Sequence, residues 1–492
     1  MRKITVDGNE ACATSAYMFT EVAGIYPITP SSTMAESVDN WSKDRKNIFN
    51  DSVKVVEMQS EAGAAGMVHG SLQSGLLTTT FTASQGLLLM IPNMYKMAGE
   101  MLPGVIHVAA RSIATHALSI FGDHQDIYAT RQTGFCILAS SSVADANYLS
   151  AVAHLSSIKA SLPFLHFFDG FRTSHEINKI NALEIEDIKG LIDYEAINKF
   201  RSRALNPNKP FTKGTAQNED IYFQIMESRN NDYTITPDIV NKYMEEINKI
   251  TGSNYKPFNY YGSSNAKKVI VAMGSVCETI KSVIDYEKED LGLIEVHLYR
   301  PFSIKYLLDV LPSSVEKIAV LDRTKEAGSI GEPLYLDIMG ALKDKNITIV
   351  GGRYGLSSKD TNAAQIKSVY DMLDNPRHNF TIGINDDVTN LSLEIDKNYK
   401  IGTSDEFLVY GYGSDGMVSS CKSIIKLVGN LTDKYVQGYF QYDSKKSGGV
   451  TIGHLRFDDK EIKSTYYVEN PKLVVCTKDT YLDKYNMLIL LV

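Results

Sequence analysis

The chain has 492 residues, of which 43% are hydrophobic and 22% charged, and its formal net charge is −8. This length exceeds what one hydrophobic core usually organises, so we expect about three domains. The negative charge argues against a nucleic-acid or acidic-membrane partner. No apolar run approaches the roughly 20 residues of a membrane-spanning helix, and the first residues lack an apolar signal core, so we expect a cytoplasmic location.

Residues 1–257 are predicted to form a first unit, in which strand-like apolar runs alternate with helical stretches. The clearest strands are Val53–Val56, Val105–Ala110, Phe135–Ala139 and Pro163–Phe168. Strands separated by helices indicate an open, largely parallel sheet with helices on both faces, and ligands bind such sheets at the carboxyl ends of the strands. The more polar stretch from about residue 180 is predicted to be a peripheral excursion that ends in a helix near Pro237–Thr251.

Two further α/β units are predicted, over residues 258–403 and 404–492. Strands of the second unit are predicted at Val269–Gly274, Leu293–Leu298, Lys317–Asp322 and Ile347–Gly351. The third unit opens with a strand into a glycine turn at Glu406–Gly413 and has only begun by the last residue. The apolar run Asn486–Val492 finishes on no turn or cap, so we expect a chain that is cut short or completed by another polypeptide.

The five cysteines, Cys12, Cys136, Cys277, Cys421 and Cys476, are far apart in the sequence. They include no Cys-x-x-Cys pair, so no iron–sulfur cluster or zinc site can be built locally. We expect five buried, reduced thiols and no metal site in this chain.

Arg111 and Thr29 are candidates for holding a small anion in the first unit. Arg111 directly follows the strand Val105–Ala110, and a guanidinium matches a carboxylate bidentately. Thr29 lies in a loop stiffened by Pro27 and Pro30, and its hydroxyl can hold a second oxygen. From the residues alone, a structural ion pair for Arg111 and a turn role for Thr29 remain open.

Glu61 is a candidate catalytic carboxylate. The segment Val55–Gly75 is predicted to be a helix whose small residues allow close approach of a neighbouring backbone or ligand. A carboxylate in such surroundings seeks a hydrogen-bond donor. An ordinary surface glutamate remains the alternative, and Glu57 is a rival one turn earlier.

Other candidate residues lie in loops. In the third unit, Gly413 within Gly411–Gly416, and Lys445 and Lys446 within Tyr442–Gly449, are typical of a phosphate-binding loop, with a structural turn as the alternative. In the first unit, His124 and His175 have acidic neighbours that suggest catalysis or metal binding. Neither has metal-ligand spacing, so we interpret both as structural histidines.

Extended motifs connect the chain to a known family. Tyr26–Ser32, Glu57–Gly66, Thr79–Gly86, Leu118–His124 and Phe167–Glu176 resemble the pyruvate:ferredoxin (flavodoxin) oxidoreductases, and the resemblance runs through nearly the whole chain. It implies a thiamine-diphosphate-binding-like fold over 1–257 and a transketolase C-terminal-like domain over 258–403. It also implies a truncated, coenzyme-A-interacting domain over 404–492.

The resemblance also implies residue roles. Thr29 and Arg111 are similar to the residues that hold pyruvate, and Glu61 to the glutamate on the aminopyrimidine of thiamine diphosphate. Gly413, Lys445 and Lys446 fall in the region used for coenzyme A. The Mg²⁺-dependent grip on the cofactor, with its Gly-Asp-Gly signature, and the [4Fe-4S] clusters belong to domains absent from this sequence.

The leading hypothesis is therefore part of an enzyme that oxidatively decarboxylates pyruvate with coenzyme A and reduces ferredoxin or flavodoxin. The resemblance implies a homodimer for the complete enzyme, and we expect the present chain to be inactive alone. Two alternatives stay open: a non-catalytic truncated remnant, and one subunit of a split 2-oxoacid oxidoreductase.

Overall fold

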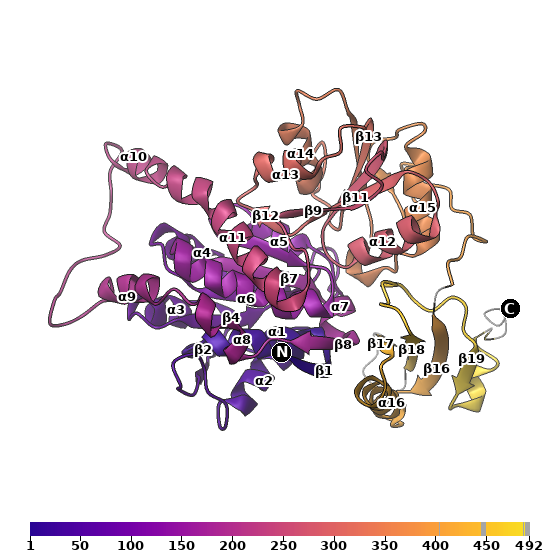
Figure 1. Cartoon of the computed structure of the whole chain (residues 1–492), viewed down its shortest axis with the longest axis horizontal. Helices are drawn as coiled ribbons and strands as arrows, with labels where there is room; N and C mark the ends of the chain where they lie inside the picture. The colour runs from indigo at the N-terminus through magenta and orange to yellow at the C-terminus, as the bar shows by residue number, and fades with distance from the viewer. Residues whose placement is uncertain (403, 444–448, 486, 488–492) are drawn as a thin grey trace.

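The computed structural model describes the chain except residues 403, 444–448, 486 and 488–492. The described residues form three sheets flanked by helices (Figure 1). In the described part of the chain, no helix is both long and apolar enough to cross a membrane.

The first sheet carries the loops of the predicted site. Its seven strands are β2 (Val22–Ile25), β3 (Lys54–Glu57), β4 (Thr78–Thr82), β5 (Val105–Ala110), β6 (Cys136–Ser140), β7 (Phe164–Asp169) and β12 (Leu298–Arg300). Their order is β12-β6-β7-β5-β4-β2-β3, and all neighbours are parallel except β12, which runs antiparallel to β6. Strands β5 and β7 are buried along their whole length, as expected of a parallel sheet covered on both faces.

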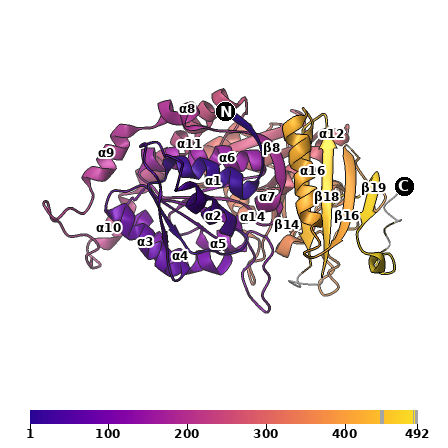
Figure 2. The same cartoon turned by 90° about the horizontal axis from the view of Figure 1, so that it is seen from below.

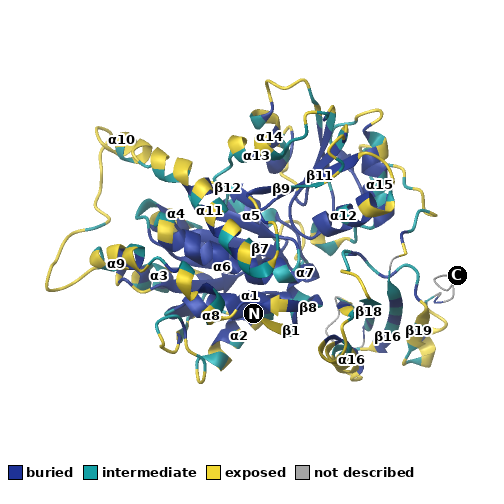
Figure 3. Ribbon diagram, viewed as in Figure 1, coloured by how far each residue is buried: buried dark blue, intermediate teal, exposed yellow. Residues whose placement is uncertain are grey.

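Helices cover both faces of this sheet and extend beyond it. They are α1 (Gly8–Phe19), α2 (Ser32–Trp41), α3 (Glu61–Gln73), α4 (Ser84–Gly99), α5 (Gln125–Thr130), α6 (Val143–Ala160), α7 (Arg172–His175), α8 (Ile185–Ile188), α9 (Tyr194–Ser202), α10 (Tyr222–Glu227) and α11 (Asn230–Thr251), with a 3₁₀ turn at Lys189–Leu191. Helix α6 is buried almost all round, and Ser142 caps its first turn by accepting a hydrogen bond from the Asp145 N–H. Helix α10 lies on the exposed excursion (Figure 3).

The second sheet is also largely parallel. Its strands are β9 (Phe258–Gly262), β10 (Lys268–Ala272), β11 (Leu291–Val296), β13 (Lys317–Asp322), β14 (Thr348–Arg353) and β15 (Phe380–Thr381), in the order β15-β14-β13-β10-β11-β9. Only β9 runs antiparallel to its neighbour. The surrounding helices are α12 (Val276–Tyr286), α13 (Ile304–Val310), α14 (Pro333–Ala341) and α15 (Ala363–Met372), with a 3₁₀ turn at Leu356–Ser358.

The third sheet departs from the predicted parallel pattern. Its strands are β1 (Arg2–Asp7), β8 (Ile177–Ala182), β16 (Asp405–Tyr412), β17 (Tyr435–Tyr442), β18 (Val450–Asp458) and β19 (Leu473–Cys476), in the order β1-β8-β17-β18-β16-β19. All pairs are antiparallel except β16 with β19. Helix α16 (Met417–Leu431) packs on this sheet, and a 3₁₀ turn spans Asp479–Tyr481 (Figure 2).

Two strands of the third sheet come from the beginning and middle of the first unit. Strand β17 pairs with β8 through Gln437 opposite Asn178 and Gly438 opposite Ile177. The third unit therefore continues a sheet that β1 and β8 begin, and this pairing between distant segments has no local signature in the sequence. The prediction of α/β units on largely parallel sheets is confirmed for the first two sheets and is wrong for the third.

Some predicted strands and helices have the bounds that the structure shows, and others begin or end at different residues. The strands Val105–Ala110 and Lys317–Asp322 are confirmed residue for residue. The helix predicted over Val55–Gly75 is wrong at its start, since Val55 lies in β3 and the helix begins at Glu61. The expectation of five buried cysteines holds for four of them, because Cys476 is half-buried. The boundaries at 257 and 403 stay predictions.

A buried ionic network joins the first two sheets. Asp169 ends β7, and its Oδ1 lies 2.5 Å from Nε2 of His124 and 2.9 Å from Nη1 of Arg323. Its Oδ2 accepts a hydrogen bond from the Ser275 N–H at 2.6 Å. Burial alone would raise the pKa of Asp169, but Arg323, His124 and the Ser275 N–H hold it well below its usual range. The carboxylate is therefore charged and fully paired between the two units.

Replacing Asp169 with Ala tests this junction. The change leaves Arg323 buried without its counter-charge, so we expect the free energy of unfolding to fall by about 3–5 kcal/mol. Urea denaturation measures the loss. As a control, Lys249→Ala removes an exposed ion pair with Glu246 on α11 and should leave the unfolding midpoint unchanged. Equal effects of the two variants would contradict a structural role for the network.

Candidate active site

The predicted site residues of the first unit, and Ser84 and Gly86 beside them, lie just after strands at one edge of the first sheet. Thr29 follows β2, Glu61 follows β3, Ser84 and Gly86 follow β4, and Arg111 follows β5. These strands are neighbours in the order β5-β4-β2-β3 and run parallel, so their carboxyl ends meet at the same edge. The fold thus brings together residues that are up to 82 positions apart in the sequence.

Arg111 and Thr29 are in direct contact. The Arg111 side chain is largely buried, and its Nη1 donates to the backbone oxygen of Thr29 at 2.8 Å. Its Nε donates to the backbone oxygen of Ser119 at 3.4 Å. In the described part of the chain Nη2 makes no hydrogen bond, and Thr29 itself is exposed. One edge of the guanidinium is held in place, and the other stays available to an anion.

A buried carboxylate that sequence reasoning did not assign fixes the backbone beneath this pair. Oδ2 of Asp126 accepts hydrogen bonds from the N–H of Arg111 at 3.0 Å and from that of Ser84 at 2.7 Å. Burial raises the pKa of Asp126 to about 8, although these N–H groups favour its charged form. Asp126 thereby ties the end of β5 to the start of α4.

Ser84 has a strained backbone at this position. Its φ angle is +52°, in the left-handed region that residues other than glycine rarely adopt. Besides its N–H bond to Asp126, its hydroxyl donates to the backbone oxygen of Ser112 at 2.5 Å. Neither the positive φ nor the role of Asp126 has a signal in the sequence, because both depend on groups that tertiary structure brings together.

Glu61 is the first residue of α3 and lies beside the start of α4. Ser60 caps the helix, since its Oγ accepts a hydrogen bond from the Gly63 N–H at 3.0 Å. A carboxylate in the first turn interacts favourably with the positive end of the helix dipole. Glu61 is only 9% exposed, yet within the described residues its carboxylate takes part in no hydrogen bond or ion pair. It is a positioned carboxylate with no partner among these residues.

Gly86 makes room for this carboxylate. A Cβ at Gly86 would lie 2.7 Å from Cγ of Glu61, 2.9 Å from its Oε1 and 2.7 Å from Oγ1 of Thr82. These separations are far below van der Waals contact, so only glycine fits while Glu61 keeps its position. The buried Thr82 hydroxyl also has no partner among the described groups. The unpaired Glu61 carboxylate fits a ligand that carries a hydrogen-bonding group.

Glu57, the rival candidate, lies at the end of β3 and is exposed. His124 bonds Asp169 in the buried network described above. His175 bonds the Ser174 hydroxyl at 2.7 Å and stacks on Phe171, and burial lowers its pKa to about 4. Both histidines are tied into the protein interior, in agreement with a structural interpretation.

Of the residues predicted to contact coenzyme A, the structure describes Gly413, beside the third sheet. Gly413 follows β16, and its N–H donates to the backbone oxygen of Gly449 at 3.2 Å. Lys445 and Lys446 lie outside the described residues. A cavity of about 400 Å³ opens between the three units, lined among others by Phe121, Phe171, Ser358 and Tyr442. The loop from Arg111 reaches this cavity, because Ser112 donates two hydrogen bonds to the Phe121 carbonyl.

Three family models match separate parts of the chain. Residues 14–245 match the pyruvate flavodoxin/ferredoxin oxidoreductase, thiamine diphosphate-binding model. Residues 266–366 match the pyruvate:ferredoxin oxidoreductase core domain II, and residues 406–490 match the pyruvate ferredoxin/flavodoxin oxidoreductase model.

Curated relatives agree with these matches. A pyruvate:ferredoxin oxidoreductase of Moorella thermoacetica is 56% identical over 99% of this chain, and a pyruvate-flavodoxin oxidoreductase of Enterobacter agglomerans is 54% identical over 98%. The chain spans 42% of the length of each.

Among solved structures, a 2-oxoglutarate:ferredoxin oxidoreductase from Magnetococcus marinus shares the fold. Its TM-score is 0.53 at 16% identity, over 71% of this chain and 62% of that one. From the family models and the curated relatives together, the chain belongs to the pyruvate:ferredoxin/flavodoxin oxidoreductase family and corresponds to its N-terminal part.

Proposed function

We propose that this chain supplies the substrate-holding and aminopyrimidine-holding side of a pyruvate:ferredoxin or pyruvate:flavodoxin oxidoreductase. In that reaction pyruvate loses CO₂ and electrons, its acetyl group passes to coenzyme A, and ferredoxin or flavodoxin accepts the electrons. One observation supports the proposal most: the half-free Arg111 guanidinium, beside Thr29, shares a sheet edge with the unpaired carboxylate of Glu61.

Arg111 and Thr29 would hold the 2-oxoacid. The backbone carbonyls of Thr29 and Ser119 orient the guanidinium through Nη1 and Nε. Nη2 could therefore bind the substrate while both of these hydrogen bonds stay in place. A carboxylate accepts charge-assisted hydrogen bonds from such a group. The exposed Thr29 hydroxyl is then available to a second substrate oxygen. Asp126 acts through Arg111 and Ser84 by holding their backbone in place.

Glu61 would exchange a proton with N1′ of the aminopyrimidine of thiamine diphosphate and so favour its imino tautomer. When bound, this cofactor supplies the nucleophilic carbon that adds to the keto group of a 2-oxoacid. Glu61 offers a carboxylate that fits one edge of such a ring, and Gly86 leaves the room that lets this side chain keep its position. The sequence contains no Gly-Asp-Gly, so the diphosphate and Mg²⁺ would be held by a part of the enzyme outside this sequence.

Coenzyme A, the electron acceptor and a second copy complete the proposal. Coenzyme A would approach from the third sheet, where Gly413 follows β16; the proposal also assigns Lys445 and Lys446 to coenzyme A from the sequence. The chain has no cysteine cluster of its own, so [4Fe-4S] clusters and the ferredoxin or flavodoxin contact would come from the complementary polypeptide. The complete enzyme would be a homodimer.

The proposal is tested by joining this chain to the part of the Moorella thermoacetica relative that it does not cover. We expect pyruvate- and coenzyme-A-dependent reduction of ferredoxin by the joined protein, and none by either part alone. A folded but inactive joined protein that binds no thiamine diphosphate would favour the truncated remnant instead.

Glu61→Gln should lower kcat of the joined protein by about 10²–10⁴-fold, the usual range for loss of an acid–base group. The amide cannot exchange a proton with N1′, although its size is conserved. The matched control is Glu57→Gln, which alters the exposed carboxylate at the end of β3 and should leave kcat unchanged. If Glu57→Gln abolished activity and Glu61→Gln did not, the assignment would pass to Glu57.

Gly86→Ala should reduce kcat by about 100-fold, because the new methyl group collides with the Glu61 side chain and moves its carboxylate out of position. The control is Gly66→Ala, where an added Cβ meets nothing within 4 Å. That change should preserve activity and raise the free energy of unfolding by about 0.5–1 kcal/mol. Steady-state kinetics and urea denaturation of both variants separate the two effects.

Arg111→Lys should raise KM for pyruvate by about 10- to 100-fold, since a charge-assisted hydrogen bond contributes about 1.5–3 kcal/mol. Lysine keeps the charge and loses the planar fork. KM for coenzyme A should stay constant in the same assay. A change confined to KM for coenzyme A would contradict the proposed role.

A further inference from the structure

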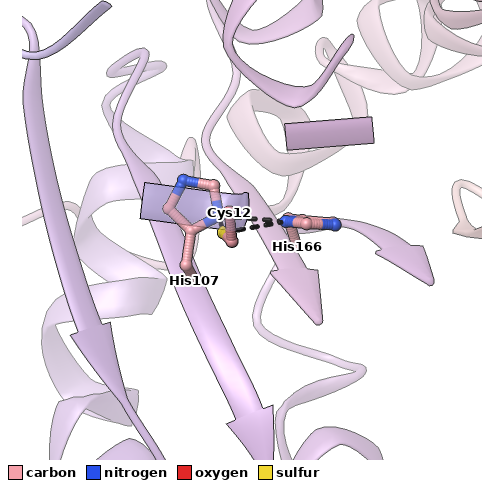
Figure 4. Close-up of side chains that lie close together, drawn as sticks. All are labelled: Cys12, His107 and His166. Atoms are coloured by element: carbon pink, nitrogen blue, oxygen red, sulfur yellow. Dashed lines mark hydrogen bonds between the residues drawn. The ribbon is translucent and has the colours of Figure 1, made fainter. Parts of the chain in front are cut away.

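The fold brings a cysteine and two histidines together inside the first unit. Cys12 lies on α1, His107 on β5 and His166 on β7, and the register of the two strands places His107 opposite His166. All three side chains are completely buried. They converge in Figure 4, although the nearest pair in the sequence is 59 positions apart.

The spacing of the three ligand atoms is that of a metal coordination sphere. Sγ of Cys12 lies 3.3 Å from Nδ1 of His107 and 3.8 Å from Nδ1 of His166, and the two Nδ1 atoms are 3.0 Å apart. The centre of this triangle is about 2 Å from each atom, and metal–nitrogen and metal–sulfur bonds are about 2.0–2.3 Å long. An ion fits with little movement of the side chains.

Both imidazoles already have partners for their other nitrogen. Nε2 of His166 lies 2.8 Å from the Ser140 hydroxyl, and Nε2 of His107 lies 3.1 Å from Nε2 of His154. Metal-binding histidines commonly donate their second ring N–H to such a partner, which fixes the tautomer that leaves Nδ1 unprotonated. The outer contacts therefore orient the atoms that would bind the ion.

We propose that Cys12, His107 and His166 form a three-coordinate site for Cu(I). Thiolate and imidazole ligands suit this soft ion, which accepts trigonal coordination. On binding, the Cys12 thiol loses its proton to solvent and a sulfur–copper bond forms, with no change in oxidation state. The single positive charge of Cu(I) and the single negative charge of the thiolate then cancel.

Charge balance selects Cu(I) over a divalent ion at this place. Aromatic rings surround the cluster, with Phe19 stacked on His154, Phe81 stacked on His107, and Phe168 against His166. Zn²⁺ with one thiolate and two neutral imidazoles would leave a positive charge in these apolar surroundings. Burying an uncompensated charge costs several kcal/mol, at an order-of-magnitude level.

The competing possibility is a metal-free chain of hydrogen bonds. Each neutral imidazole can donate one N–H to the next acceptor, from His154 through His107 and His166 to Ser140. Such a chain satisfies the same nitrogens and needs no ion, so only a metal-binding experiment separates the two.

The test refolds the 492-residue chain from urea with Cu(I) under anaerobic conditions, because the site is fully buried. A bathocuproine chelator then removes loosely held metal, and copper is counted per chain. We expect about one retained ion per wild-type chain, as for other sites whose binding is coupled to folding. X-ray absorption should show one sulfur and two nitrogen ligands at about 2.0–2.3 Å.

Cys12→Ser should lower copper retention at least tenfold while the metal-free protein keeps its circular dichroism spectrum. Cys136→Ala, which removes an equally buried thiol outside the cluster, should retain the ion. The proposal is overturned if wild type retains no more copper than Cys12→Ser, or if absorption data show no sulfur ligand. The absorption data on wild type decide the question even where the serine variant fails to fold. Retention of Zn²⁺ in preference to Cu(I) would overturn the choice of ion.

Discussion

The buried carboxylate of Asp169 is the contact on which the arrangement of the first two units depends. It ends β7 and meets Arg323, His124 and the Ser275 N–H, so one side chain connects the first sheet to the second. The same contact holds His124 next to the segment that carries Asp126. Moving the two units apart would leave Asp169 and Arg323 buried without their partners, which is costly. This ion pair therefore holds the two units in one relative position. The loops at the carboxyl edge of the first sheet are then presented by a fixed frame.

Parallel strand order explains the site more simply than any motif does. Four neighbouring strands end at one edge, and one part of the site follows each of them: Thr29, Glu61, the start of α4 at Ser84–Gly86, or Arg111. The chain orients these groups through its own backbone, as the Thr29 carbonyl on Arg111 shows. It nevertheless leaves the Glu61 carboxylate and one edge of the guanidinium without partners among the described residues. A preorganised but unsatisfied set of polar groups is what a ligand-binding half-site requires.

Local patterns were sufficient where the structure depends on local physics. The largely apolar run Val105–Ala110, interrupted by His107, indicated a buried parallel strand, and the loop position of Arg111 followed from it. Local patterns do not predict pairing between strands that are far apart in the sequence. No pattern near β8 indicates that it pairs with β17, so the antiparallel third sheet was not predicted. The helix predicted from Val55 overlapped the strand predicted at Val53–Val56, and its start was wrong because β-branched Val55 and Val56 favour the strand. Metal-ligand spacing was sought locally, whereas Cys12, His107 and His166 meet only through strand register and helix packing.

The central claim is that the carboxyl edge of the first sheet faces a complementary polypeptide together with thiamine diphosphate. Amide hydrogen exchange tests this most directly, on the chain alone and mixed with the remaining part of the Moorella thermoacetica relative, cofactor, Mg²⁺ and pyruvate. The account predicts slower exchange at residues 26–32, 58–63, 83–87 and 111–121, the loops that follow β2, β3, β4 and β5. Unchanged exchange in these four segments, with slower exchange elsewhere, would contradict it.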